Sequence, residues 1–511
     1  MPENNEHFKR SIWWIKRDMR LLDNEALVEA IKSSSNVLPV FIFEDILLKS
    51  PETSVFHVNA WIQGLKELRK NLQQIGGDIW VAIGNVEDVF SEIYKIYPFE
   101  AVFSHMETGS DVTYQRDFQM KKYFENKNIA WIEMYQNSVR RRLKNISKRE
   151  RHWREYVTKD ILQKPTLIPL EKNILEIAQS KIIPNISALG FRGEGKKMQK
   201  VDEENAQRLL NSFLYKRSKN YIKEISSPNT AIQHGSRLSP HLAWGTISLR
   251  TVYKATQNRI QELSNYEKNN YWIFCLKAFI SRLHWHDHFV QRLELNPQME
   301  FETLHSGFSE IPYKDREEIL NKWLQGQTGF PIVDACMRCL QTTGFINFRM
   351  RALIVSFACF VLHLSWKSIN APLAQLFADY EPGIHICQIQ MQAGVVGINS
   401  IRVYSPKKQA MDQDPECNFI KKWIPELRDY KVSEIHNYDK FTFKTYPQPI
   451  VDYESSSKQM KKIIFSIKNS KISKEESQVI QEKYGSKWRP RSRSKSKKLK
   501  KEDNQTKLFE T

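Results

Sequence analysis

The sequence contains no long run of uncharged apolar residues. The best candidate, 352–362, covers eleven residues between Arg351 and His363, whereas a helix that crosses a bilayer needs about 20. The N-terminus also lacks the apolar segment of a secretion signal, and the chain has only six cysteines. We therefore predict a protein of a reducing compartment, the cytoplasm, without a membrane partner.

Metal-ligand and dinucleotide motifs are missing as well. Cys336 and Cys339 form a C-x-x-C pair, but Cys359, Cys387 and Cys417 stand singly, so no second pair completes a zinc or iron–sulfur site. We expect these thiols to be structural and predict no metal. The N-terminal part has no G-x-G-x-x-G sequence, so no dinucleotide is predicted there.

Acidic residues are scarce relative to basic ones. The chain has 77 Lys and Arg against 58 Asp and Glu, a net charge of +19, of which the tail 486–511 carries +7 and the body +12. A basic body indicates a polyanionic partner such as DNA or RNA. A generally basic proteome would produce the same balance, so charge alone leaves both interpretations open.

A chain of 511 residues exceeds what one core supports, so two or three domains are expected. Residues 1–135 contain five short apolar runs, each typical of a buried parallel strand, with helical patterns such as 60–72 between them. They predict a doubly wound α/β domain with a five-stranded parallel sheet. The expected strands are Ser11–Ile15, Leu38–Phe43, Ile79–Ile83, Ala101–His105 and Ala130–Met134.

The rest of the chain changes character. Residues 136–205 are basic and irregular, and they predict an interdomain connector with little core of its own. Residues 206–485 carry long helical patterns and predict an all-α domain, in which the apolar segment 348–366 is a central buried helix. Further helices are expected over 271–293 and 332–343. The tail 486–511 is low in complexity and is predicted to be disordered.

Two clusters in the helical region carry candidate chemistry. In the segment 236–242, two serines, Arg237 and a proline bracket a helix start with Ser239 as N-cap. They suit a phosphate cradle, although an ordinary capped helix has the same pattern. Arg351, at the start of the apolar helix, needs an anionic partner, and Asp379 and Glu381 are candidates. Such a pair is either a structural clasp or the electrostatic floor of a cofactor site.

Four segments occur together in one order: WWIKRDMRLLDNEAL (13–27), GSRLSPHLAWGTIS (235–248), WLQGQTGFPIVDACMR (323–338) and 402–427. In sequence, order and spacing they resemble the photolyase/cryptochrome family. The resemblance implies blue-light flavoproteins with FAD in the helical domain. In the photolyases, light-excited reduced FAD donates an electron to a pyrimidine dimer flipped out of DNA, the dimer splits, and the electron returns. Such a site needs a dry cavity and a basic mouth for the DNA backbone.

The resemblance also assigns residues. It implies a dimer-pocket wall at Trp285, while Arg282 occupies the position of a dimer-contacting glutamate. His286 replaces an arginine and Phe348 an asparagine near the flavin. His385 stands where an asparagine faces flavin N5, and an imidazole there either modulates flavin protonation or is a packed polar residue. The implied FAD contacts are Tyr221, Ser236, Arg237, Leu238, Ser239, His286, Phe348, Arg351, Asp379, Glu381 and His385.

The electron relay and the antenna of the family are altered. Trp366 matches the middle relay tryptophan, but the inner position is Ile389, which cannot hold a hole, and the outer is Tyr313. Tyr380 and Tyr404 are candidate replacements. Six-four photolyases have a histidine where this chain has Asn347, which favours cyclobutane dimers. A second, antenna chromophore of unknown identity is a candidate cofactor, because Glu107 resembles an acidic antenna contact.

These observations predict an FAD-dependent photolyase, a monomer that acts on damaged DNA at the nucleoid. A cryptochrome-type photoreceptor without repair activity is the alternative, favoured by Arg282 and the altered relay. A redox-inert flavin store or a structural DNA binder is a third. The residues Gln505–Phe509 resemble the peptide that docks bacterial repair proteins on the sliding clamp, although a featureless tail explains them too.

Overall fold

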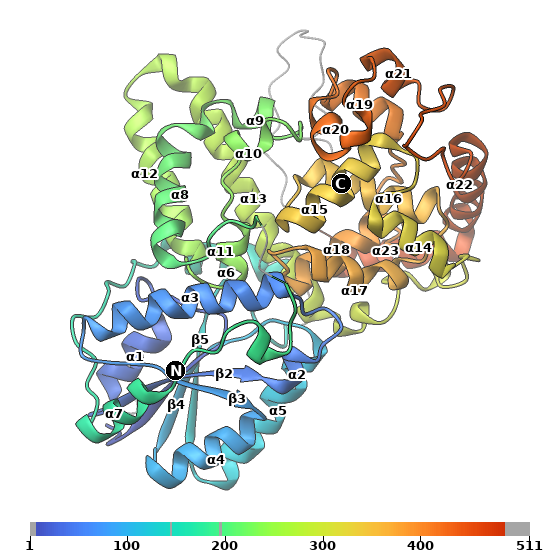
Figure 1. Cartoon of the computed structure of the whole chain (residues 1–511). Coiled ribbons are helices and arrows are strands. Elements are labelled where there is room, and N and C mark those ends of the chain that lie inside the picture. The colour runs from blue at the N-terminus through green and yellow to red at the C-terminus, as the bar shows by residue number, and fades with distance from the viewer. Residues whose placement is uncertain (1–6, 144–145, 194–196, 486–511) are drawn as a thin grey trace.

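The computed structural model describes residues 7–143, 146–193 and 197–485. A blue-to-cyan α/β domain lies at the bottom of Figure 1, and the helices drawn in yellow to red lie above it. The tail 486–511, with its predicted disorder and clamp peptide, falls outside the described residues. Within the described ranges, no single helix has the length and apolar content to cross a bilayer. One pair of helices, bent by 118° between them, would be long and apolar enough when the two are taken together, by length and composition only.

The N-terminal domain contains a five-stranded, fully parallel sheet of order β3-β2-β1-β4-β5. All five predicted strands are confirmed, each within one residue at either end. The strand order reverses at β1, so the carboxyl ends of β1 and β4 open the crevice in which doubly wound sheets bind ligands. The strands are β1 (Ser11–Ile15), β2 (Val37–Glu44), β3 (Trp80–Gly84), β4 (Ala101–Met106) and β5 (Ala130–Tyr135).

Helices cover both faces of this sheet. Successive strand side chains point to opposite faces, so Trp13 packs in the cluster with α1 and α3, while Trp14 packs with α4 and α5. Both indoles are fully buried. The helices are α1 (Glu25–Ser33), α2 (Asp45–Leu48), α3 (Val55–Gln73), α4 (Val86–Ile96) and α5 (Asp111–Asn126).

The segment expected to be irregular, 136–205, contains two helices, α6 (Arg149–Thr158) and α7 (Lys172–Ser180). Trp153 of α6 packs into the helical region, and Ile174 of α7 packs against the sheet. The segment therefore contributes to the cores on both sides of it.

The helical region follows the predicted pattern with one correction. The expected helix over 348–366 ends at Phe360, and a second begins at Trp366. His363 has a φ of 58°, a left-handed conformation that no α-helix continues through, and Ser365 then caps the new helix at Ser368 N–H. The helices are α8 (Glu203–Tyr215), α9 (Tyr221–Glu224), α10 (Ala231–His234), α11 (Ser239–Ala243), α12 (Leu249–Ser264), α13 (Asn270–Leu295), α14 (Glu317–Gln325), α15 (Pro331–Thr343), α16 (Phe348–Phe360), α17 (Trp366–Leu376), α18 (Pro382–Gln392), α19 (Pro406–Gln413), α20 (Asn418–Trp423), α21 (Val432–His436), α22 (Tyr453–Asn469) and α23 (Lys471–Tyr484).

The loop after β1 joins the two regions. Asp23 accepts hydrogen bonds from Arg250 Nη2 at 2.5 Å and Nε at 3.0 Å, and both side chains are at most 2% exposed. Nearby, a Cβ on Gly245 would lie 1.8 Å from the Arg17 carbonyl oxygen. Only glycine permits this approach, and its φ of 69° is also one that glycine adopts readily.

Candidate functional site

A cavity of about 1790 Å³, open solvent at its mouth included, lies in the helical region between α11 and α13 on one side and α16 and α18 on the other. Most residues that the family resemblance singled out line it, although they come from widely separated parts of the chain. They are Tyr221, Ser236, Arg237, Ser239, Arg282, Trp285, His286, Phe348, Arg351, Asp379, Glu381 and His385.

Two of the predicted residues do not line this cavity. Leu238 is buried in the hydrophobic cluster behind it, because its backbone, not its side chain, belongs to the turn at Arg237. Trp366 is 2% exposed at the start of α17, within the core. Ile389 does line the cavity, so an aliphatic side chain stands there at the inner relay position. Tyr380 also lines it, whereas Tyr404 packs in the core.

One end of the cavity is cationic. Arg237 has a left-handed φ of 58°, and its buried Nε has no hydrogen-bond partner among the described residues. Burial, and then the charge of Arg208, lower the pKa of Arg237. Burial and Arg237 together lower the pKa of Arg217 to about 10. Arg217 donates to the carbonyls of Gly235 and Ser236, whereas Arg237 lines the cavity. A desolvated guanidinium with a free donor on the cavity wall suits an anionic group.

The N-cap prediction at this turn is wrong. Helix α11 begins at Ser239, its N-cap is Leu238, and no side chain caps it. The early start arises because Pro240 occupies one of the first two helical positions, where its fixed φ suits a helix. Ser239 is exposed on the cavity wall instead.

The same cavity is lined by the predicted ion pair, which is confirmed. Arg351 donates from Nη1 and Nη2 to the two carboxylate oxygens of Asp379 at 3.0 and 2.9 Å. Its Nε donates to the Ile346 carbonyl at 2.9 Å, and the guanidinium lies 4.2 Å from the centre of the Phe377 ring. This bidentate geometry fixes the plane of the guanidinium at the cavity wall.

Glu381 has a different partner from the one proposed. It pairs with Arg17 of the β1 loop at 3.1 Å, and its buried Oε1 has no hydrogen-bond partner among the described residues. Arg17 also donates to the carbonyls of Ala243 and Tyr380. The N-terminal domain thus supplies the cation that pairs with a carboxylate of the cavity wall, a contact that the sequence pattern did not reveal.

The pKa values of the two histidines shift in opposite directions. His385 lies 3.0 Å from the Asn370 carbonyl through Nε2, and burial lowers its pKa to about 4, so the ring is neutral with Nδ1 as an acceptor. Burial also opposes a charge on His286, but its hydrogen bond with Asp287 at 3.0 Å outweighs this and raises its pKa.

An aromatic wall stands next to these groups. Trp285 is 6% exposed and stacks on Phe289 with ring centres 5.6 Å apart. Arg282, one turn earlier, hydrogen-bonds Tyr221, and burial raises the pKa of that phenol. A flat apolar surface beside a multiple hydrogen-bond donor can hold a heteroaromatic ring with carbonyl groups.

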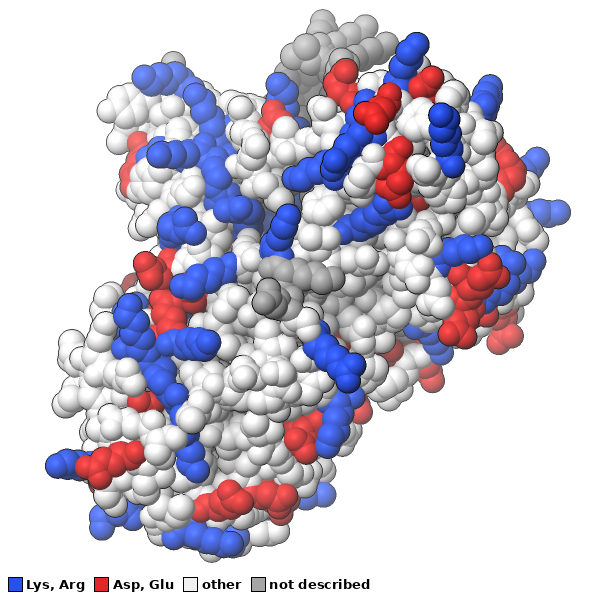
Figure 2. Space-filling view, in the orientation of Figure 1, with Lys and Arg blue, Asp and Glu red and all other residues white. Residues whose placement is uncertain are grey.

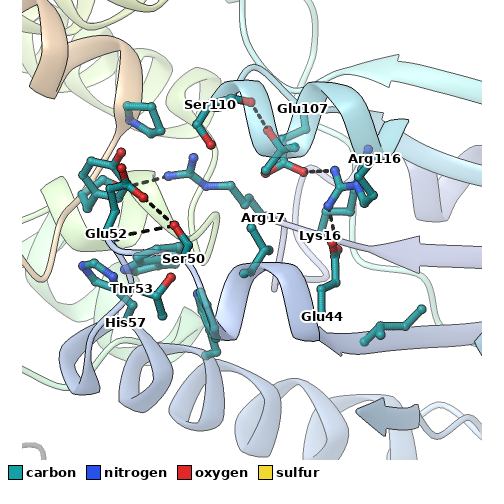
Figure 3. Close-up of a pocket in the computed structure, with 18 of the residues that line it drawn as sticks. Lys16, Arg17, Glu44, Ser50, Glu52, Thr53, His57, Glu107, Ser110 and Arg116 are labelled. Carbon is teal, nitrogen blue, oxygen red and sulfur yellow. Dashed lines mark hydrogen bonds and ion pairs between the residues drawn. The ribbon is translucent and has the colours of Figure 1, made fainter. Parts of the chain in front are cut away.

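A second cavity, of about 760 Å³ with its open mouth included, lies at the carboxyl ends of β1, β2 and β4 and reaches Trp244 and Tyr380 (Figure 3). Arg116 pairs there with Glu44 at 2.6 Å and Glu107 at 2.5 Å. Burial raises the pKa of Glu44 to about 7, and its Oε2 has no hydrogen-bond partner among the described residues. This is the crevice that the strand order predicts.

Comparison with known proteins identifies the architecture. Residues 11–152 match the family model described as DNA photolyase, and residues 279–465 match the FAD binding domain of DNA photolyase. The chain belongs to the photolyase/cryptochrome family.

Three relatives illustrate the family. Deoxyribodipyrimidine photo-lyase from Halobacterium salinarum is 25% identical over 482 residues, which cover 86% of this chain and 96% of that protein. Cryptochrome DASH from Solanum lycopersicum is 27% identical over 455 residues, with 82% and 77% covered. An archaeal photolyase from Sulfolobus tokodaii, solved with two FAD molecules, has a TM-score of 0.75 at 26% identity and covers 89% of this chain and 99% of that one.

FAD is the cofactor of this photolyase-type domain, and the cavity fits it. The buried Arg237 Nε without a partner among the described residues meets the need of a diphosphate for donors, and the ion pair at Asp379 lines the same cavity. Sequence reasoning missed Arg217, which lies 20 residues before Arg237 in a lysine-rich stretch. The one feature of the sequence that pointed to Arg217 was its closeness to Tyr221, which the family resemblance had already assigned to the cofactor site.

Proposed function

We propose that this protein repairs pyrimidine dimers in DNA under blue light, with the cyclobutane type as its substrate. One observation carries the proposal: a single cavity is lined both by the guanidinium of Arg237, whose Nε has no hydrogen-bond partner among the described residues, and by the aromatic wall at Trp285. The first suits a diphosphate and the second suits a flipped-out thymine dimer, that is, two adjacent thymines of one strand. Deoxyribodipyrimidine photo-lyases are among the family members similar to this chain.

The residues would divide the work as follows. When bound, FAD supplies light absorption and single-electron transfer. Arg237 would hold its diphosphate, Arg217 would support the backbone of the turn through the Gly235 and Ser236 carbonyls, and the Arg351–Asp379 pair would orient polar groups of the cofactor. Trp285 stacks on the dimer, and Arg282 donates hydrogen bonds to its carbonyls. The closely packed walls exclude water from the reacting groups.

Two features bear on the type of lesion. Asn347 donates from Nδ2 to the carbonyls of Ile225 and Ser226, at 3.0 and 2.7 Å, and an amide held in this way does not exchange a proton. A proton-transferring histidine is thus lacking at this position, which supports cyclobutane repair. Ile389 on the cavity wall favours the alternative, a photoreceptor with slow photoreduction.

A repair assay separates the two functions. Chemically reduced, FAD-loaded protein should split cyclobutane dimers in an oligonucleotide under blue light, and the product is counted by recovery of thymine absorbance. Trp285→Ala should weaken dimer binding about 10-fold, because one stacking contact is worth about 1–3 kcal/mol. Intact dimers after illumination of the reduced wild-type protein would establish the photoreceptor instead.

We infer a second chromophore in the cavity of Figure 3, whose unpartnered Glu44 Oε2 calls for a hydrogen-bond donor. Protein from its native source should release a second pigment with FAD on denaturation. Glu44→Gln should lower the ratio of that pigment to FAD about 10-fold, since a hydrogen bond to a charged group is worth about 1.5–3 kcal/mol. Glu318→Gln, at an exposed ion pair on α14, is the control. Release of FAD alone, or an unchanged ratio, contradicts the assignment.

Three further proposals concern partners. A dimer-repairing protein works on chromosomal DNA, which supports the nucleoid as its place of action. The clamp peptide Gln505–Phe509 is tested by deletion of residues 505–509, which should abolish capture by an immobilised sliding clamp. The monomeric state is tested by the mass of the FAD-loaded protein in solution.

A further inference from the structure

The outer half of α13 exposes aromatic rings that the proposed site does not use. Tyr271 is 48% exposed and Phe274 45% exposed. At 100° per residue, positions 271, 274, 278, 281 and 285 follow one face of a helix. The exposed rings therefore continue the face that carries Trp285 into the cavity.

The residues between the two ends leave room along this face. Ala278 and Ser281 are small and partly exposed. Fourteen residues separate Tyr271 from Trp285, so the face is about 21 Å long. One nucleotide of a duplex strand rises about 3.4 Å, and the face thus matches roughly six nucleotides.

Lysines flank the same face. The short helical turn Arg217–Asn220 and α9 pack along α13, where Trp272 Nε1 donates to Ser218 Oγ at 2.7 Å and Cys275 Sγ contacts the Lys219 carbonyl at 3.5 Å. Lys219 and Lys223 on this turn and on α9 are exposed, as is Lys277 on the opposite side. Figure 2 shows Lys and Arg gathered along the upper left of the molecule, over the region of α8, α9 and α12.

We propose that this surface, the α13 ledge (Tyr271, Phe274, Ala278, Ser281, Lys219 and Lys223), binds the DNA that flanks the lesion on one side. The lysines contact phosphates, and the two rings stack on bases or sugars beyond the cavity mouth. Positive charge interleaved with exposed rings matches a nucleic-acid strand better than an apolar protein face. The inference rests on the proposed function, because it takes the lesion at Trp285 as the origin of the strand.

The lysine variants test the electrostatic part. Lys219→Ala/Lys223→Ala should bind a lesion oligonucleotide with a long flank about 10-fold more weakly at physiological salt. The slope of log affinity against log salt should become less steep by about 2, roughly 1 per phosphate contact. With flanks of about three nucleotides, the affinity should equal that of the wild type, because such a strand does not reach the ledge.

A variant without the two rings tests the aromatic part, with substrates whose long flank lies on one side of the lesion or on the other. Tyr271→Ala/Phe274→Ala should lose at least 5-fold in affinity when the long flank lies on one side of the lesion, and nothing when it lies on the other. Lys458→Ala/Lys462→Ala/Phe465→Ala, on an exposed face of α22, is the matched control and should bind normally.

Measurements of FAD content and of repair of the short substrate distinguish a failure of the ledge proposal from a failure of the proposed function. Both should be normal in the ledge variants, since no altered side chain lines the cavity. The ledge would be overturned if the variants bound long-flank substrates as tightly as the wild type does, whichever side of the lesion carries the flank. It would also be overturned if the variants lost as much affinity for short substrates as for long ones. Failure of wild-type protein to repair any substrate would instead overturn the proposed function.

Discussion

Arg237→Ala protein should retain at most a tenth of the FAD that the wild type holds after gel filtration. In the structure this guanidinium is half-buried, its Nε has no partner among the described residues, and its pKa is lowered by burial. Its charge is uncompensated until an anion binds. Charge-assisted hydrogen bonds of this kind are worth about 1.5–3 kcal/mol each, which corresponds to roughly 10- to 100-fold in affinity.

The measurement is the ratio of flavin to protein absorbance, followed by titration of the apoprotein with FAD. Arg237→Lys keeps the charge at the left-handed position and should retain an intermediate amount. Arg151→Ala, which removes a mostly exposed guanidinium on α6, is the control for a general loss of cations. A wild-type ratio in Arg237→Ala would place the diphosphate elsewhere in the cavity.

The sheet could be predicted from the sequence almost residue by residue, and the reason is physical. A parallel strand covered on both faces must be apolar throughout, so its ends coincide with the first polar residues, as at Ser11–Ile15. At the end of α16, no change from apolar to polar residues marks the boundary in this way. Apolar residues continue past Phe360 through Val361 and Leu362 and resume at Leu364, while the chain leaves the helix through the left-handed His363.

The site could be predicted only in part, for a related reason. The Arg351–Asp379 pair joins residues 28 positions apart, and it could be proposed because a buried arginine needs an anionic partner. Arg17 reaches Tyr380 across 363 positions, and no local pattern announces such a contact. Family resemblance assigns Glu381 to the flavin, and Glu381 lines the cavity, but no sequence pattern indicated its ion pair with Arg17 of the other domain.

The ion pair between Arg17 and Glu381 lies between the two cavities. Its guanidinium lies 5.0 Å from the centre of the Trp244 ring and lines the second cavity, while its partner Glu381 lines the first. The position of the β1 loop against the helical region therefore sets the geometry of both sites. What holds this loop in place matters for function as much as for stability.

Asp23→Ala should destabilise the protein by about 3–5 kcal/mol, the cost of leaving a buried charge without its partner. Arg250 is fully enclosed; burial opposes its charge, and the hydrogen bonds to Asp23 more than offset this, so that its pKa is raised. Ser248 Oγ and Leu162 N–H donate to the same carboxylate. Removal of one side chain thus breaks the contact between the β1 loop, the connector and α12 together.

Urea unfolding of the FAD-loaded protein, followed by circular dichroism at fixed excess FAD, measures this loss. Asp23→Asn keeps the shape and tolerates the left-handed φ of 57° at this position, so any destabilisation it causes isolates the charge. Asp45→Ala breaks the exposed pair with Lys49 and should cost less than about 1 kcal/mol. Because the β1 loop also carries Arg17, Asp23→Ala should weaken FAD binding at urea concentrations well below the unfolding midpoint, whereas a clasp that serves stability alone would leave FAD affinity unchanged there.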